Sequence, residues 1–555
     1  MHPNDPKRSR RGKKGRKGRG KAAAAHSWQQ QREAETPLAS FPRHGHYRLA
    51  LAYANGYHVG MSSLGFQRSY ELVHRRPEWS CERFFTDGEG MPLSVESDTP
   101  LNSMGCIAFS VSFEEDYVHL LQMLDRASIP LRREDRSDRD PLILLGGSCA
   151  TINPLPMAAF VDAFPLGAAE NLLPSLQEIL ETSVDRQEVL ERLAETPGFY
   201  VPGLHETSDR SGVDKLEKLE ISAGQMQQPG FLPTTSILTP HTEFANKFLI
   251  EMSRGCPEKC RYCWATFGMG KFRWHPEAFI LDAMERARAH TDEVGFVATA
   301  VGDHPQVENI LRTGVEMGFR TSVSSIRIPA VTEGVLDALR ASGSRSITLA
   351  PETGTDRLRK EMGKPITNAT LLDKIRLIFR SGLTQLKLYF IVGLPGETDD
   401  DIEGILRLAA QARQIMLEEL AQPKGILGHI HLGASVLVPK PYTPWQRHPM
   451  AEPKVVKRKL ARLKQGVARL PNATLSTGSV RQAIWQTYIS RADHRAAEAL
   501  EAAARGHKLS AVLRDYRDTI HPEVWGDFEG PLRWHFMRTA LPPMSVQSPP
   551  QRASA

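Results

Sequence analysis

The chain has 555 residues and a formal net charge of +6, with 41% hydrophobic and 24% charged residues. This length exceeds what one hydrophobic core can serve, so we expect about three domains, and the composition is typical of globular proteins in water. No apolar run reaches the roughly 18 residues of a membrane-spanning helix. The basic N-terminus lacks the apolar centre of a secretory signal, so we expect a cytoplasmic protein without a membrane partner.

Residues 1–45 are predicted to be a disordered basic tail. Residues 1–25 hold ten Lys or Arg and one Asp, which leaves a net charge of −3 for the rest of the chain. Like charges and glycines without apolar periodicity cannot build a core. Such a tail can bind RNA or ribosomes through phosphate contacts, and a solubilising extension is the alternative.

Residues 46–182 alternate between strand and helix patterns. Strands are predicted at 47–53, 106–112, 142–145 and 161–166, and helices at 64–75, 117–127 and 170–181. This alternation predicts a Rossmann-like α/β domain, with a parallel sheet and helices on both faces. Ligands of such sheets bind beyond the carboxyl ends of the strands.

Three loops at those strand ends combine glycines with small polar residues. Glycine lets a bulky ligand approach the backbone closely. In order and rough spacing, the loops resemble the cobalamin-binding domain of B12-dependent radical SAM proteins. The resemblance implies a cobalamin site that is formed by Asn55, His58, Ser110, Ser112, Gly146 and Gly147.

One departure from that family concerns the cobalt ligand. The Asp-x-His-x-x-Gly motif of base-off cobalamin proteins is absent, because Gly56 precedes His58 by two residues and Met61 stands where the motif has glycine. A histidine ligand to cobalt is therefore not implied. A domain that kept the fold and lost the ligand is the alternative.

Residues 183–240 are predicted to be a connector, since prolines and polar residues accumulate towards its end. Residues 241–445 then repeat a strand–helix unit six times. The strands are predicted at 248–253, 294–300, 321–327, 346–351, 385–392 and 429–438. We expect an open (β/α)6 barrel of the TIM type, with functional residues at the carboxyl ends of its strands.

The first of these strands leads into Cys256, Cys260 and Cys263, at the spacing Cys-x3-Cys-x2-Cys. Three thiolates can hold three irons of a [4Fe–4S] cube and leave the fourth iron open, whereas electron-transfer clusters use four cysteines. A zinc site, which prefers four ligands, and three unrelated thiols are the alternatives. The spacing, with Tyr262 before the last cysteine, resembles the radical SAM superfamily, in which the open iron binds S-adenosylmethionine (SAM).

The same resemblance implies SAM contacts at the later strand ends. These are Tyr262 in the cysteine loop, Gly302 and Asp303 after the second strand, Ser325 and Arg327 after the third, Glu352 after the fourth, and Gly393, Gly396 and Glu397 after the fifth. Taken singly, each could instead be a tight turn or a surface salt bridge. Their ordered series is what favours a SAM site.

The rest of the chain is predicted to be a helical cap over the barrel opening at residues 446–541 and a disordered tail at 542–555. Cys81, Cys106 and Cys149 lie in or beside predicted strands. We expect them to be buried free thiols, so no second iron–sulfur centre is predicted.

The resemblance implies a radical SAM enzyme that cleaves SAM reductively to a 5′-deoxyadenosyl radical. We expect association with cobalamin, C-methylation of an unidentified substrate, and electrons from a flavodoxin- or ferredoxin-type donor; rearrangement and cyclisation are other outcomes. The alternatives are modification of tRNA or a ribosomal component without cobalamin, and a non-catalytic cobalamin or SAM sensor. No catalytic acid or base is assigned.

Overall fold

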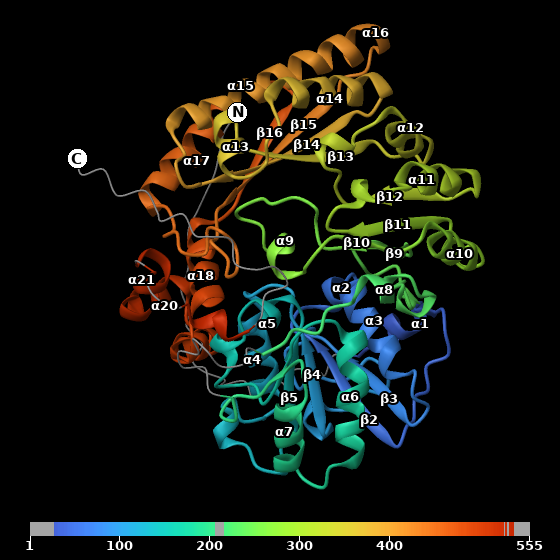
Figure 1. Ribbon diagram of the computed structural model, residues 1–555, viewed down its shortest axis with the longest axis vertical. Helices are drawn as coiled ribbons and strands as arrows, with labels where there is room; N and C mark the ends of the chain where they lie inside the picture. The colour runs from blue at the N-terminus through green and yellow to red at the C-terminus, as the bar shows by residue number, and fades with distance from the viewer. Residues whose placement is uncertain (1–26, 206–215, 527, 530–531, 538–555) are drawn as a thin grey trace, which may run out of the picture.

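The computed structural model describes residues 27–205, 216–526, 528–529 and 532–537. Figure 1 shows two α/β units, one above the other, with the C-terminal helices along one side of both. The sheets are predominantly parallel, and the expected α/β architecture is confirmed.

The N-terminal domain is a parallel sheet of four strands in the order β3-β2-β4-β5. The strands are β2 (Tyr47–Tyr53), β3 (Trp79–Phe84), β4 (Cys106–Ser110) and β5 (Leu142–Gly146). β2 starts the sheet and has β3 on one side and β4 on the other, which is the topological switch point of a doubly wound fold. The loops after β2 and β4, which are candidates for ligand binding, therefore lie at the same edge of the sheet.

Alternate residues of β2 face opposite layers of helices. Leu49 and Leu51 belong to the core under α3 (Leu64–Val73) and α6 (Ala169–Thr182), whereas Ala50 and Ala52 belong to the core under α4 (Asp116–Arg126). No strand was expected at the position of β3. The strand expected at 161–166 is reduced to β6 (Phe164–Pro165), which pairs antiparallel with β7 (Phe199–Tyr200).

The segment before the first domain is more ordered than expected. The basic run lies outside the described residues, but residues 27–45 are not a disordered tail. They form α1 (Gln29–Ala34) and β1 (Thr36–Pro37), and β1 pairs with β8 (Ile237–Leu238). Trp28 is 1% exposed, because its ring packs into the N-terminal core.

The barrel is split into two sheets of four strands each. The first has the order β10 (Arg273–Trp274), β9 (Phe248–Arg254), β11 (Glu293–Ala298) and β12 (Arg320–Val323). The second has the order β13 (Ser346–Glu352), β14 (Gln385–Val392), β15 (His429–Val436) and β16 (Ala473–Thr477). All neighbours are parallel except β10 and β9.

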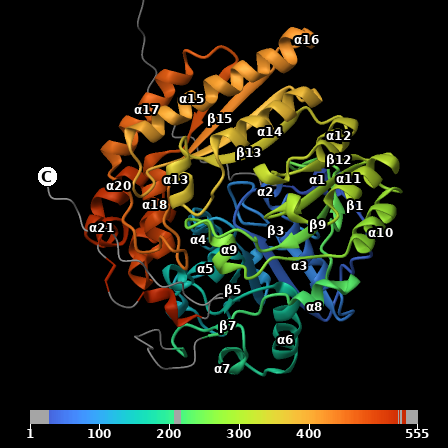
Figure 2. The same cartoon turned by 45° about the horizontal axis from the view of Figure 1, so that its top comes forward.

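The six strands expected for the barrel are thus present, but β12 and β13 are not paired as strands. β12 ends at Val323, and Ile326 donates one backbone hydrogen bond to Thr348 at 3.4 Å. Helices α10 (Glu277–Ala287), α11 (Val307–Glu316), α12 (Glu333–Ala341), α14 (Asn368–Ser381) and α15 (Asp399–Met416) cover the outside (Figures 1 and 2).

The C-terminal region differs from a purely helical cap. α17 (Pro453–Val467) packs on α15, and the chain then adds β16 to the second sheet. The remaining helices are α18 (Val480–Arg491), α19 (Ala497–Ala504), α20 (Leu509–Asp515) and α21 (Arg517–Trp525). α19 packs against α4 of the N-terminal domain, so this group bridges the two units. None of the described helices is both long and apolar enough to cross a membrane.

Candidate functional site

The loop that carries the three cysteines, residues 255–263, follows β9 and ends at α9 (Trp264–Gly268). Gly255 has a φ of 75°, and a Cβ there would lie 2.7 Å from the Gly270 carbonyl oxygen. Only glycine fits this turn without strain. In Figure 1, α9 lies between the barrel and the N-terminal domain, so the loop faces the junction of the two units.

The three thiols share a partly enclosed space. Cys260 is 7% exposed, and Cys256 and Cys263 are half-buried. Burial raises the pKa of all three thiols, that of Cys260 to about 12, while the nearby Lys364 ammonium acts in the opposite direction. The thiolate is the form that binds iron, so a bound cation is what would hold these side chains deprotonated.

Within the described part of the chain, no three His, Cys, Asp or Glu side chains are grouped around a single-ion site. A [4Fe–4S] cube does not need such a group, because each cysteine binds a different iron. The donor set of the loop therefore fits a cube with one open iron.

Backbone contacts attach the cysteine loop to the second sheet of the barrel. The Arg261 N–H donates to the Met362 carbonyl at 2.9 Å, and the Trp445 N–H donates to the Arg261 carbonyl at 3.3 Å. A Cβ on Gly363 would lie 2.6 Å from the Lys259 carbonyl oxygen. The loop starts from the first sheet and is held by the second, so it spans the gap between them.

Tyr262 and Glu352, two residues predicted to contact SAM, are hydrogen-bonded to each other. The Tyr262 hydroxyl donates to the Glu352 carboxylate at 2.6 Å, and the Lys364 ammonium lies 2.8 Å from the same carboxylate. Burial and the Glu352 charge raise the pKa of Tyr262 far above its ordinary value, so Tyr262 remains the donor. Glu352 has a φ of 67°, which is strained for a side chain of this size.

Asp303 and Arg327 are also brought together. The Arg327 guanidinium forms a two-pronged ion pair with Asp303 and a further ion pair with Glu258 of the cysteine loop. Burial alone would lower the pKa of Arg327, but these carboxylates raise it. Gly302 packs closely, since a Cβ there would lie 2.6 Å from the Ala330 side chain. Ser325 is exposed and lines the interior of the barrel.

The turn after β14 is built as expected, but its carboxylate is engaged within the protein. Gly393 and Gly396 have φ values of 89° and 70°. The Glu397 carboxylate accepts from the Gly393 N–H at 2.9 Å and from the Lys459 ammonium at 2.8 Å. Burial raises the pKa of Glu397 against the effect of Lys459. In this arrangement Glu397 stabilises the turn, in which Gly393 is buried and Gly396 is exposed.

A crevice of about 400 Å³ separates the N-terminal domain from the barrel. Ser110, Ser112 and Gly147 line it from the N-terminal domain, and Ser253 and Trp264 line it from the barrel. Three of the residues predicted for cobalamin thus share this space with Arg254 and Trp264, which flank the cysteine loop.

Asn55 and His58 do not line this crevice. The Asn55 side chain donates to Asp116 at 3.0 Å and accepts from the Gly56 N–H at 2.8 Å. His58 is largely exposed and lies 3.3 Å from the Glu243 carboxylate. Both side chains are therefore occupied by contacts within the protein.

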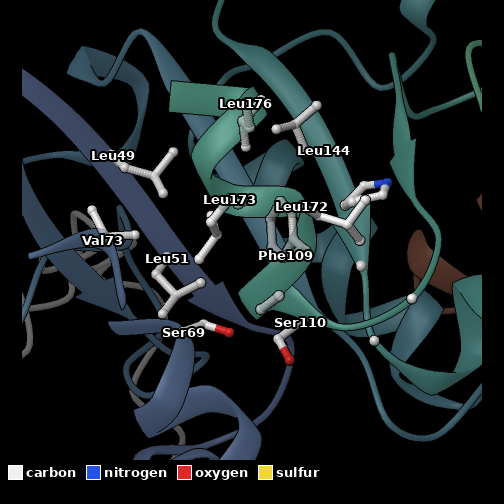
Figure 3. A pocket seen from close by; sticks show the side chains of 16 residues that line it. Leu49, Leu51, Ser69, Val73, Phe109, Ser110, Leu144, Leu172, Leu173 and Leu176 are labelled. Carbon is white, nitrogen blue, oxygen red and sulfur yellow. The ribbon is translucent and has the colours of Figure 1, made fainter. Parts of the chain in front are cut away.

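An apolar slot of about 80 Å³ lies beside the crevice, between the sheet and helices α3 and α6 (Figure 3). Six leucines line it, and the Ser69 and Ser110 hydroxyls lie at one end of it. Gly146 and Gly147 also line the slot. Gly147 has a φ of 97°, and a Cβ there would lie 2.5 Å from the Val111 carbonyl oxygen, so glycine is required at this position.

Several residues at the crevice were not predicted from the sequence. The Arg254 guanidinium pairs with Glu251 at 2.5 Å and with Glu170 of α6 at 2.8 Å, which ties the start of the cysteine loop to the N-terminal domain. The Trp264 indole N–H is buried and has no hydrogen-bond partner among the described residues. Adjacency to Gly255 and Cys263 was the available signal for these two residues; nothing local marks Glu170.

Comparisons with known proteins agree with this architecture. The family described as "Radical SAM proteins, N-terminal" matches residues 65–202, and the "Radical SAM superfamily" matches residues 250–409. The chain is 23% identical over 491 residues to uncharacterized protein MJ0966 of Methanocaldococcus jannaschii, covering 88% of this chain and 97% of that protein. It is 25% identical over 167 residues to uncharacterized methyltransferase PH0819 of Pyrococcus horikoshii, covering 29% and 36%.

A solved structure with the same fold is the radical S-adenosylmethionine methyltransferase TsrM of Kitasatospora setae, with cobalamin and a [4Fe–4S] cluster bound. The TM-score is 0.51 at 13% identity, and the match covers 86% of this chain and 98% of TsrM. At this identity the likeness concerns the fold.

Proposed function

The chain belongs to the radical SAM superfamily, and we propose that Cys256, Cys260 and Cys263 hold a [4Fe–4S] cluster at which SAM is cleaved reductively. When bound, the cluster and SAM supply a 5′-deoxyadenosyl radical. The protein contributes orientation and the exclusion of side reactions. The observation that carries this proposal is the cysteine loop, which is anchored on both halves of the barrel and is contacted by Glu352 and Arg327, two of the residues predicted for SAM.

The neighbouring side chains suit that role. Lys364 places a positive charge near Cys260, which offsets the negative charge of three thiolates. The Asp303–Arg327 pair offers both a carboxylate and a guanidinium beside the loop, so it can bind the amino and carboxylate groups of an amino acid such as the methionine part of SAM. Tyr262 and Glu352 position the loop segment between the last two cysteines.

We further propose that a corrinoid occupies the crevice and serves a C-methylation. Ser110, Ser112 and Gly147 offer hydroxyls and a close backbone approach on one side, and Trp264 offers an aromatic surface on the other. The apolar slot next to Gly147 suits a flat, uncharged group of such a ligand. His58 does not line the crevice, so the corrinoid would be bound without His58 as a ligand. The folds of TsrM and this chain agree with the assignment.

The alternative of a methylthio transfer to RNA or a ribosomal protein finds less support. The resemblance to such enzymes implies three further cysteines that hold a second cluster. Cys81, Cys106 and Cys149 are 2%, 5% and 1% exposed, respectively, within the N-terminal cores. Burial raises the pKa of each thiol, which is the environment of inert cysteines.

The test is anaerobic reconstitution of the full chain with iron and sulfide, followed by reduction in the presence of SAM. We expect formation of 5′-deoxyadenosine, its loss in Cys260→Ala, and its retention in the matched control Cys81→Ala, which removes a buried thiol far from the loop. Reduced protein with a complete cluster that leaves SAM intact would contradict the proposal. Purification with cobalamin tests the second part, since a chain that keeps no corrinoid after gel filtration does not form the proposed site.

A further inference from the structure

The inner face of the second sheet of the barrel, β13 to β16, is polar, unlike the packed interior of a complete barrel. Along β13 to β15, one set of alternate residues is buried against the outer helices, such as Leu349, Leu388 and Leu432. The other set points into the barrel and remains partly open to solvent. Complete barrels fill this space with branched apolar side chains. An open polar face therefore indicates a binding surface.

Strand register places the inward residues in rows across the sheet. One row contains Thr348, Lys387, His431 and Thr474, because each is the direct partner of the next across β13 to β16. The adjacent row, towards the carboxyl ends, contains Tyr389, Gly433 and Ser476. Paired strands lie about 4.8 Å apart, so each row forms a continuous strip that one small molecule can span.

The two histidines of this face are held by hydroxyl groups. His431 contacts Thr474 through Nδ1 and Ser476 through Nε2, each at 3.0 Å, and His429 contacts Thr474 at 2.8 Å. Burial lowers the pKa of His431, and the neighbouring Lys387 and His429 act in the same direction. The imidazole of His431 is therefore neutral near pH 7, and its two ring nitrogens hold the Thr474 and Ser476 hydroxyls in place.

Among the inward positions of β13 to β16 on the amino-terminal side of Glu352, Lys387 is the one Lys, Arg, Asp or Glu. It is half-buried, and within the described part of the chain it has neither an ion pair nor a hydrogen bond to its ammonium group. It lines a cavity of about 690 Å³ together with Lys247, Glu243 and Glu251. Two of those charges have a partner of opposite charge, since Lys247 lies 3.7 Å from Glu293 and Glu251 pairs with Arg254. The Glu243 carboxylate is largely exposed and lies 3.3 Å from the His58 ring.

Tyr389 lies beside this cation and is 43% exposed. Its ring packs over Gly433, where an added Cβ would lie 2.5 Å from a ring carbon. Glycine at this position of β15 lets the ring lie close to the sheet. An aromatic surface next to an unpaired ammonium suits a flat molecule with a negative charge at one edge.

We propose that this inner face, formed by Thr348, Lys387, Tyr389, His431 and Ser476, binds a planar substrate that carries an oxyanion, either a carboxylate or a phosphate. Lys387 binds the oxyanion, the Thr348 and Ser476 hydroxyls bind its polar edge, and Tyr389 contacts the flat part. His431 orients the Ser476 hydroxyl. This inference rests on the proposed function, because it names the substrate class of the same barrel.

Calorimetric titration of the reconstituted full chain tests the proposal without any turnover. The probes are benzoate and phenyl phosphate, with neutral benzamide for comparison. We expect both anions to bind, the stronger one identifying the oxyanion. Affinity should fall about tenfold or more in Lys387→Met, since a charge-assisted hydrogen bond is lost, and should also fall in Tyr389→Leu. Lys457→Met is the matched control, because Lys457 is exposed on α17, and it should bind like the wild type.

Benzamide should bind wild type and Lys387→Met equally. Failure of the wild type to bind either anion, or equal anion binding by wild type and Lys387→Met, overturns the inference. Cleavage of SAM by the wild type is measured separately in the same preparation without any aromatic anion. Binding without cleavage would contradict the proposed function alone, and cleavage without binding would contradict the substrate class alone.

Discussion

Replacing Glu352 by alanine and by glycine separates the strain of its backbone from the loss of its carboxylate. Both variants lose the bonds to Tyr262 and Lys364, which lie at 2.6 and 2.8 Å. A hydrogen bond to a charged group contributes about 1.5–3 kcal/mol, so both variants should be less stable than the wild type. The φ of 67° makes the two variants differ from each other.

At Glu352 the glycine variant should be more stable than the alanine variant, which is the reverse of the usual order. A left-handed conformation costs an alanine about 1–2 kcal/mol and glycine almost nothing. Glycine loses about 0.4–1 kcal/mol more chain entropy on folding. Glu352→Gly should therefore be more stable than Glu352→Ala by about 0.5–1 kcal/mol. At Glu285, an exposed position in the right-handed helix α10, the order should reverse, with alanine more stable by up to about 1 kcal/mol.

Urea unfolding of the four variants under anaerobic conditions, with the slopes compared as well as the midpoints, measures these differences. Iron retention after gel filtration gives the functional readout, and both Glu352 variants should retain less iron than the wild type because the cysteine loop loses an anchor. An alanine variant at least as stable as the glycine variant would mean that Glu352 is not left-handed in the folded chain. Full iron retention in both would mean that the Tyr262–Glu352 bond does not hold the loop.

Three further predictions concern the N-terminal domain and its contacts. Trp28→Ala should lower the free energy of unfolding by about 3–5 kcal/mol, measured by urea unfolding. A change below about 1 kcal/mol would contradict the packing of Trp28 into the N-terminal core. Burial acts to raise the pKa of Glu114, but Lys440 lowers it below its ordinary 4.5. The ion pair therefore stabilises the fold above pH 4.5, and this stabilisation is lost as the pH falls through the lowered pKa of Glu114. Unfolding followed against pH should then show Glu114→Gln less stable than the wild type at neutral pH and converging with it in acid. Gly147→Ala should lose corrinoid binding in a spectroscopic titration, whereas Gly105→Ala, where an added Cβ meets no atom within 4 Å, should bind like the wild type.

The sequence was sufficient where one local pattern determines one structural feature. The cysteine loop and the glycine turn depend on neighbours in the chain, and each follows the strand after which it was expected, β9 and β14 respectively. It was insufficient where partners are distant. β3 contains Glu82 and Arg83, which interrupt its apolar pattern, yet both are buried. Glu82 pairs with Arg48, and Arg83 pairs with Glu35 and Glu96. Glu35 and Glu96 lie 48 and 13 residues from Arg83 in the sequence. The pair with Arg83 places Glu35 in the folded domain, although the composition around it indicated a tail.

The split of the barrel was equally beyond local reasoning. β12 and β13 each read as an ordinary strand, and only their spatial separation shows that the two sheets do not close. β16 is short and its residues are largely exposed, so the sequence around it was interpreted as part of a helical cap. The exposed inner face of the second sheet follows from this split, because an incomplete barrel leaves its interior unfilled.

The cysteine loop connects the three parts of the molecule that substrate chemistry would involve. Its first residues follow Arg254, which is paired with Glu170 of the N-terminal domain. Its middle is bound by Met362 and Trp445 of the second half-barrel, and its end leads to Trp264 at the crevice. Any ligand that changes the spacing of the two units must therefore change the position of the three thiols. For that reason, occupation of the crevice and the reactivity of the proposed cluster should be coupled, and a corrinoid added to the full chain should alter the rate of SAM cleavage even without a methyl acceptor.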